Sequence, residues 1–281
     1  MTLRVLTPDD VPAAMALVEQ AGWNQTPADW RRFLSASADG CFAAVVDGAV
    51  VGTSATIGYG GAVAWIGMVI VDARHRGKGI GRQLLQRACA AVDAAGIPCA
   101  KLDATPAGEP LYMRHGFVRE RSLERWEWHR VGACPSPSPS LPVFRSSLSE
   151  DAFALDRSVF GVDRRAVLRS LHEEWAEAAM EVRTGSGLRG YSLGRRGLVA
   201  DHLGPWVASD ESAAATLLDR FLIQSSRPRV FVDSFVDHPF ASRLLTDRGF
   251  QRQRSLVRMS RGPGPDAHDS DMLAVLGVEF G

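Results

Sequence analysis

Residues 65–85 have the sequence WIGMVIVDARHRGKGIGRQLL, and this stretch is the strongest indication of the fold in the 281-residue chain. An apolar strand is predicted from Trp65 to Val71, followed by a basic, glycine-spaced loop. A helix is predicted directly after the loop and up to Gly96, because apolar residues recur at near-helical spacing: Ile80, Leu84, Ala88 and Val92. Backbone N–H groups and the positive end of that helix would then point into one small volume, which is suited to phosphate.

The spacing of the loop excludes two common phosphate-binding motifs. A P-loop requires Ser or Thr after its lysine, but Lys78 is followed by Gly79. A dinucleotide-binding loop requires a third glycine where this chain has Arg82. What remains is Arg76-x-x-Gly79-x-Gly81, which resembles the Arg/Gln-x-x-Gly-x-Gly/Ala motif of the GNAT acetyltransferases.

The resemblance to the GNAT family extends to about Phe117. It includes Leu-Asp-Ala at 102–104 and Leu-Tyr-Met-Arg-His-Gly-Phe at 111–117, which are similar to that family's closing strand, helix and strand. The resemblance implies an α/β fold of the α+β kind with a mixed sheet. It also implies transfer of an acetyl group from acetyl-CoA to an amine.

The family resemblance also implies where acetyl-CoA binds. Backbone N–H groups of the loop suit the pyrophosphate, since glycines allow close approach, and Arg76 and Lys78 add charge. The pantetheine arm can pair with the strand over 68–71, where a bulge in this family frees one N–H for the thioester carbonyl. We therefore expect the cofactor to contact Met68, Val69, Ile70, Val71, Arg76, Gly77, Lys78, Gly79, Ile80, Gly81 and Arg82.

Tyr112 occupies the family position of the general acid. A phenol with a pKa near ~10 can donate a proton to the departing thiolate, whose conjugate acid titrates near ~8.5 by analogy with cysteine. The alternative interpretation is that Tyr112 is an aromatic residue of the hydrophobic core, just before the pair Gly116-Phe117. The sequence does not assign any carboxylate as the base that takes the proton from the amine. Glu109 is expected to be a solvated residue at a helix start, and Asp103 and His115 are weaker candidates.

Candidate acceptor-binding residues come from both halves of the chain. Trp23, Asn24 and Gln25 precede a helix start at Thr26-Pro27, and they can fill core or line a pocket. His202 and Asp163 are the corresponding candidates in the second half. We expect the second half to shape the acceptor pocket.

The chain is predicted to contain two related domains. A Pro/Ser-rich segment over residues 131–142 is typical of an extended linker, so we expect one GNAT domain over 1–130 and a degenerate GNAT-like domain over 143–281. The pair Leu217-Leu218 precedes Gly249-Phe250 by the same 32 positions that separate Leu84-Leu85 from Gly116-Phe117. The second copy has Ser-Asp-Glu-Ser at 209–212 instead of the glycine loop and Leu245 instead of the tyrosine. This copy is therefore expected not to bind CoA.

Composition limits the classes of partner. The 32 basic and 32 acidic residues balance, so no net field favours nucleic acid or an anionic membrane. The four cysteines form no C-x-x-C pair, and no metal site is expected. Residues 48–71 are uncharged and long enough to span a bilayer, but their glycines indicate two β-rich runs around a turn. With no signal-peptide pattern at the N-terminus, a cytoplasmic protein is expected.

The function predicted from the sequence is N-acetyl transfer from acetyl-CoA to a primary amine of a small molecule by direct attack. Two alternatives stay open: a non-catalytic acyl-CoA-binding sensor, and an acyltransferase for a larger metabolite amine, as in the mycothiol synthases. The overall pattern resembles a two-domain bacterial subgroup of GNAT proteins. The identity of the acceptor, the length of the acyl group and the oligomeric state stay open.

Overall fold

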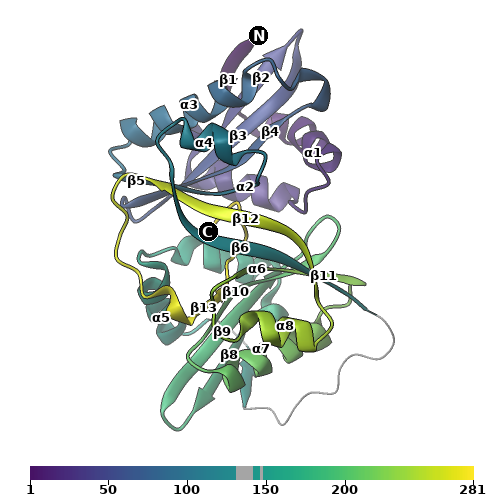
Figure 1. Cartoon of the computed structure of the whole chain (residues 1–281), viewed down its shortest axis with the longest axis vertical. Helices are drawn as coiled ribbons and strands as arrows, with labels where there is room; N and C mark the ends of the chain where they lie inside the picture. Colours follow the sequence, from purple (N-terminus) through teal and green to yellow (C-terminus); the bar gives the residue numbers. More distant parts are fainter. Residues whose placement is uncertain (131–141, 146–147) are drawn as a thin grey trace. The chain divides into compact units, whose positions relative to one another are not determined.

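The chain forms two compact units that are not consecutive in sequence (Figure 1). The computed structural model describes residues 1–130, 142–145 and 148–281, so most of the expected linker lies outside the described residues. Unit 1 comprises residues 1–120, 258–265 and 279–281, and unit 2 comprises 121–257 and 266–278. Two strands, β6 (Val118–His129) and β12 (Gln251–Arg261), begin in one unit and end in the other.

Unit 1 contains a mixed sheet with helices on both faces. Its elements are β1 (Thr2–Val5), α1 (Val11–Gln20), α2 (Pro27–Ala36), β2 (Phe42–Val46), β3 (Ala49–Tyr59), β4 (Val63–Val71), α3 (Ile80–Ala94), β5 (Cys99–Ala104) and α4 (Glu109–Met113), with short 3-10 turns η1 (Pro8–Asp10), η2 (Ala38–Gly40) and η3 (Ala73–His75). The strand order is β1-β2-β3-β4-β5, and the last residues of β12 follow β5. Strands β1 to β4 are antiparallel, whereas β4 and β5 are parallel.

Local sequence signals explain the main helices of unit 1. Helix α2 begins at Thr26, where the Thr26 and Asp29 side chains form a reciprocal capping box. Helix α3 begins after Gly79, which has a positive φ of 79° that favours glycine. The apolar face of α3 then packs Ile80 and Leu84 against Phe42 and other residues of β2 and β3. The strand, glycine loop and helix predicted over residues 65–96 are therefore present.

Unit 2 repeats this arrangement. Its elements are β6, β7 (Val143–Arg145), α5 (Glu150–Phe160), α6 (Arg165–Glu174), η4 (Ala176–Ala178), β8 (Met180–Thr184), β9 (Gly187–Arg195), β10 (Asp201–Ala208), α7 (Glu211–Gln224), β11 (Arg229–Phe235), α8 (Ala241–Asp247), β12, η5 (Asp269–Asp271) and β13 (Met272–Ala274). The strand order is β12-β6-β11-β13-β10-β9-β8-β7. The series β10, α7, β11, α8, β12 matches β4, α3, β5, α4, β6 in type and order, and β10 and β11 are also parallel.

The core of unit 2 lies between its sheet and helices α7 and α8. Trp206 of β10, Phe221 of α7 and Leu244 of α8 belong to one cluster of buried apolar residues. Leu245, at the position that matches Tyr112, is completely buried in the same cluster. The second copy thus has a packing residue where the first has a phenol.

Candidate active site

Strands β4 and β5 separate in the middle of unit 1. They pair only from Val63 to Trp65 with Cys99 to Lys101, although both strands continue beyond these residues. The two strands separate where β4 has a bulge. Gly67 and Ile70 of β4 lie opposite Ala55 and Thr53 of β3, so β4 has one more residue than β3 over this stretch. Backbone groups of β4 beyond Trp65 therefore have no partner in β5, and an extended ligand could pair with them.

Met68 lies at the centre of this bulge. Its φ is 56°, which is unusual for a residue with a side chain. The hydroxyl of Thr53 in β3 donates a hydrogen bond of 2.8 Å to the carbonyl oxygen of Met68 and so stabilises the bulged conformation. The bulge occurs at the residues where the family resemblance implies a freed N–H, while the role of that N–H stays a prediction.

The loop between β4 and α3 is braced by Asp72, a residue that the sequence analysis missed. The Asp72 carboxylate accepts hydrogen bonds from the backbone N–H of Arg74 at 2.9 Å and from Nε2 of Gln20 at 3.2 Å, and it lies 3.0 Å from Nδ1 of His75. Hydrogen bonding by the Arg74 side chain, and next by His75, lowers the pKa of Asp72 well below its usual range. The Gln20 side chain also accepts from the N–H of Ala73 at 3.0 Å, so α1 helps to hold the loop.

The glycines of the loop leave space where a phosphate would bind. Gly77 has a φ of 76°, and a Cβ added there would meet no atom within 4 Å. The first N–H groups of α3, beginning at Ile80, have no acceptor within a helix because helix geometry provides none. Arg76 and Lys78 are exposed beside them. This arrangement is suited to an anion, and the individual contacts of the expected cofactor residues stay predictions.

Tyr112 lies on the short helix α4. Its ring makes an edge contact with Phe117 at a centroid distance of 6.1 Å. Burial of the phenol, with a smaller contribution from Cys89, raises the pKa of Tyr112 to about 12. The side chain is therefore protonated at neutral pH and is able to donate a proton.

The other acid–base candidates near Tyr112 are engaged in the structure. Glu109 is mostly buried and pairs with Nε of Arg119, so the expectation of a solvated residue is wrong. Asp103 accepts two hydrogen bonds from the guanidinium of Arg258, at 2.9 and 3.0 Å. Both carboxylates are therefore held in ion pairs by arginines.

The candidate acceptor residues lie in different parts of the structure. Trp23 is half-buried just before α2, and Asn24 and Gln25 are buried beside it in unit 1. In unit 2, His202 is completely buried and 3.5 Å from a carboxylate oxygen of Asp233, and burial lowers its pKa to about 3. Asp163 is exposed and accepts a hydrogen bond from the backbone N–H of Arg165 at 2.8 Å. Their roles in binding an acceptor stay predictions.

Residues 279–281 add a wall to unit 1 that no sequence signal indicated. The ring of Phe280 stacks on Phe33 of α2 at a centroid distance of 4.8 Å. The hydroxyl of Tyr59 in β3 donates a hydrogen bond of 2.8 Å to the carbonyl oxygen of Phe280. Next to it, the backbone of Glu279 lies against Gly67 of β4, one residue before the bulge.

In unit 2 the space between the two parallel strands is filled by the chain itself. Strands β10 and β11 pair only from Asp201 to Leu203 with Val230 to Val232. Beyond that point β13 pairs with both strands, through Trp206 opposite Ala274 on β10 and Ser234 opposite Ala274 on β11. The backbone that would be free for a ligand is therefore hydrogen-bonded to a strand.

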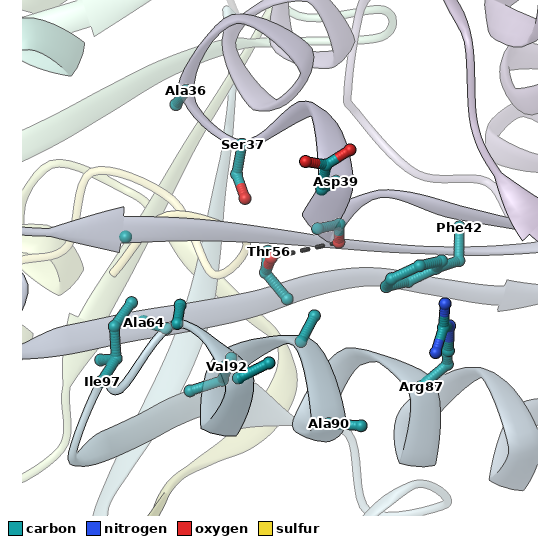
Figure 2. A pocket seen from close by; sticks show the side chains of 15 residues that line it. Ala36, Ser37, Asp39, Phe42, Thr56, Ala64, Arg87, Ala90, Val92 and Ile97 are labelled. Carbon is teal, nitrogen blue, oxygen red and sulfur yellow. Dashed lines mark hydrogen bonds between the residues drawn. The ribbon is translucent and has the colours of Figure 1, made fainter.

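A separate cavity of about 530 Å³ lies on the face of unit 1 that α3 covers (Figure 2). Arg87, Ala90 and Val92 of α3 line one side of this cavity, and Phe42 and Thr56 of β2 and β3 line the sheet side. These α3 residues come from the second half of the helix, away from the glycine loop at its start. The cavity is therefore not part of the candidate active site.

Residues 1–130, 142–145 and 148–281 contain neither a metal-binding cluster nor a membrane-spanning helix. No cluster of three or more His, Cys, Asp or Glu side chains in these ranges is arranged to hold a metal ion. In the same described part of the chain, no helix has both the length and the apolar character required to cross a membrane.

Comparisons with known families identify both halves of the chain. Residues 37–119 and residues 152–274 each match a family model described as an acetyltransferase (GNAT) domain. A relative from Bacillus subtilis, the uncharacterised N-acetyltransferase YitH, is 26% identical over 193 residues, which are 68% of this chain and 67% of that protein. The holothin acyltransferase of a Pseudoalteromonas species is 23% identical over 92% of this chain and 87% of its own length.

A solved structure has the same fold over the whole chain. A candidate acetyltransferase from Pyrococcus horikoshii superposes with a TM-score of 0.85 at 21% identity, covering 100% of this chain and 95% of that one. The two matched domain models and the strand arrangement repeated in the two units both indicate a tandem architecture. The chain belongs to the GNAT family of acyltransferases and contains two GNAT domains.

Proposed function

We propose that this tandem GNAT protein transfers an acetyl group from acetyl-CoA to a primary amine of a small molecule by direct attack. The observation that carries the proposal is the geometry of unit 1, where β4 separates from β5 at a bulge and leads into a braced glycine loop. Such a site offers an extended backbone edge beside an anion-binding helix start. This combination matches an acyl-CoA, which is both amide-rich and rich in phosphate.

The loop and the strand would hold different parts of the cofactor. The pyrophosphate would accept hydrogen bonds from N–H groups between Gly77 and Arg82, with charge from Arg76 and Lys78. The pantetheine arm would pair with the backbone from Met68 to Val71. The bulge at Met68 would direct one N–H to the thioester carbonyl, where such a donor typically lowers the barrier by about 3 kcal/mol.

Proton transfer would then complete the reaction. The amine nitrogen attacks the thioester carbonyl carbon, and the C–S bond breaks. Tyr112 donates its phenolic proton to the sulfur, so free CoA leaves as a thiol. Burial raises the pKa of Tyr112 to about 12, so the phenol carries its proton at the pH values where a neutral amine is present.

We propose that only unit 1 binds the cofactor. Strand β13 occupies the position between β10 and β11 where a pantetheine arm would pair, and the first turn of α7 carries Glu211 beside its cap residue Asp210. Carboxylates at this end of a helix repel a pyrophosphate. The second unit keeps the GNAT architecture but offers neither the free strand edge nor the glycine loop.

The experiment that tests the proposed function is release of CoA thiol from acetyl-CoA across a panel of primary amines. The panel includes spermidine, glucosamine, a dipeptide and holothin, since the holothin acyltransferase aligns with most of this chain. We expect acetylation of at least one member, confirmed by a mass increase of one acetyl group. Tight acetyl-CoA binding without release of CoA for any amine would support a sensor instead.

A further inference from the structure

Gln20 links the end of helix α1 to the loop that follows β4. Its Oε1 accepts a hydrogen bond of 3.0 Å from the backbone N–H of Ala73, and its Nε2 donates one of 3.2 Å to Oδ2 of Asp72. Both polar atoms of one side chain are therefore bonded to two consecutive residues, which lie 53 and 52 positions later in the chain. A contact at two points fixes the orientation of the loop as well as its position.

The backbone of Gln20 is held in place by the packing of α1. Gln20 is the last residue of this helix, and Leu17 and Val18 in the same turn are buried. Their carbonyl oxygens each accept a hydrogen bond of 3.0 Å, from the N–H groups of Ala21 and Trp23 respectively. The exposed side chain of Gln20 therefore extends to the loop from a fixed helix end.

Asp72 organises the first half of the loop. Its backbone N–H donates a hydrogen bond of 2.9 Å to the carbonyl oxygen of Val51 in β3. Its carboxylate accepts from the N–H of Arg74 at 2.9 Å, and its carbonyl oxygen accepts from the N–H of His75 at 2.9 Å. Residues 72–75 are therefore held to β3, to α1 and to one another.

The glycine half of the loop gains most from this support. Gly77 and Gly79 have φ values of 76° and 79°, and a Cβ at Gly77 would meet no atom within 4 Å. Glycine loses more conformational freedom than any other residue when it is ordered. That cost lowers the affinity for a ligand unless contacts within the protein fix the loop before the ligand binds.

The charge of Asp72 indicates an indirect role at the anion site. A carboxylate repels a phosphate, so Asp72 is unsuited to contact one. Nε and Nη2 of Arg74 each lie 3.3 Å from an oxygen of the Asp72 carboxylate, so that carboxylate is already paired with a cation. A paired carboxylate at the start of an anion-binding loop is suited to shaping the loop.

We propose that Gln20 and Asp72 are positioning residues for the cofactor, which hold the loop in the conformation where its N–H groups receive the pyrophosphate. This inference rests on the proposed function. The role of the two residues is confined to the phosphate end of acetyl-CoA. Their contribution should therefore appear in the affinity for the cofactor and not in the chemical step.

The variant Gln20→Leu tests this role at an exposed position, where the core is not disturbed. Leucine cannot form either hydrogen bond. We expect the dissociation constant for acetyl-CoA, measured by calorimetry, to rise by roughly 3–30-fold, as the loss of one or two hydrogen bonds predicts. The value of kcat at saturating acetyl-CoA should be unchanged. The value of kcat/KM with S-acetylpantetheine, which has the same thioester but no phosphate, should also be unchanged.

Two further variants separate this role from a general structural effect. Gln86→Leu makes the same substitution at an exposed position of α3 and should keep the wild-type affinity for acetyl-CoA. Asp72→Asn should weaken binding, and the double variant with Gln20→Leu should lose less than the product of the two single losses, because both residues act through one contact.

The outcomes distinguish this inference from the proposed function. Wild-type affinity in Gln20→Leu, or equal losses of kcat/KM with acetyl-CoA and S-acetylpantetheine, would overturn the positioning role. If the wild-type chain does not bind acetyl-CoA at all, the proposed function itself is contradicted.

Discussion

Tyr112 provides the first test at the scale of single residues. The variant Tyr112→Phe removes one proton donor and keeps the ring that contacts Phe117. Since general acids typically contribute ~10²–10⁴-fold, we expect turnover to fall within that range while the dissociation constant for acetyl-CoA stays the same. Steady-state kinetics and calorimetry measure the two quantities. A loss smaller than about threefold under conditions where chemistry limits turnover would identify Tyr112 as a packing residue.

His202 provides a test by pH. Burial lowers its pKa from 6.5 to about 3, so between these values the unfolded chain binds a proton that the folded chain does not. Its contribution therefore makes the free energy of unfolding decrease as the pH falls below about 6.5, by at most roughly 1.4 kcal/mol per pH unit.

Urea unfolding at a series of pH values measures this effect. The variant His202→Gln should show a smaller loss of stability on acidification than the wild-type chain. The matched control His129→Gln changes an exposed histidine, whose side chain is 58% exposed, and should behave like the wild type. An identical pH dependence in wild type and His202→Gln would contradict the burial of a neutral imidazole.

Some residues of the site were predictable and others were not, for a physical reason. The glycines and basic residues of the loop are local, so their spacing alone indicates an anion site. Asp72 is bonded to Gln20, which is 52 positions away, and Glu279 meets Gly67 only after the chain has folded. Contacts of this kind leave no periodic or spacing signal in a single sequence.

At the scale of elements, the approach of residue 279 to β4 can be tested through Gly67. The variant Gly67→Ala places a methyl group 2.8 Å from the backbone oxygen of Glu279, so the segment must move. We expect a destabilisation of about 1–3 kcal/mol, as is typical of overpacking, together with reduced turnover. The affinity for acetyl-CoA should stay close to the wild-type value, because the loop is untouched.

The control for this prediction is Gly58→Ala in β3. A Cβ at Gly58 would meet only the end of the Ile97 side chain, at 3.3 Å, and that side chain can adjust. Thermal unfolding and CoA release should show a much smaller effect than Gly67→Ala. Equal effects of the two variants would mean that the position of the segment does not matter to turnover.

The elements of unit 1 were largely predictable, whereas one element of unit 2 was not. Strand β4, helix α3 and strand β5 follow from apolar periodicity and turn residues. Strand β13 has only three residues and no alternating pattern, and it pairs with strands about 40 and 70 positions earlier in the chain. Its position between β10 and β11 therefore depends on tertiary contacts, which the local sequence does not indicate.

At the scale of the whole molecule, the repeat was visible in the sequence but the assignment of segments to units was not. The equal spacing of Leu-Leu and Gly-Phe pairs reflects two copies of one supersecondary pattern, and both copies match GNAT domain models. Residues 258–265 and 279–281 nevertheless belong to unit 1. Such an exchange depends on strand pairing between distant segments, which composition and linkers do not reveal.

The central claim is that one cofactor site per chain lies at the glycine loop of unit 1, and a pair of glycine variants isolates that site. Gly79 begins α3 with a φ of 79°, and Gly96 lies just after its end with a φ of 68°. A Cβ at Gly96 meets no atom within 4 Å, so Gly96→Glu adds the same charge and a similar backbone strain without touching the loop.

Calorimetric titration of acetyl-CoA into the full chain is the most direct test of this claim. The wild-type chain and Gly96→Glu should each bind one acetyl-CoA per chain with similar affinity. Gly79→Glu should bind none, because its carboxylate and Cβ occupy the phosphate position, while its circular dichroism spectrum stays native. Two sites per wild-type chain, or undiminished affinity in Gly79→Glu, would contradict the account.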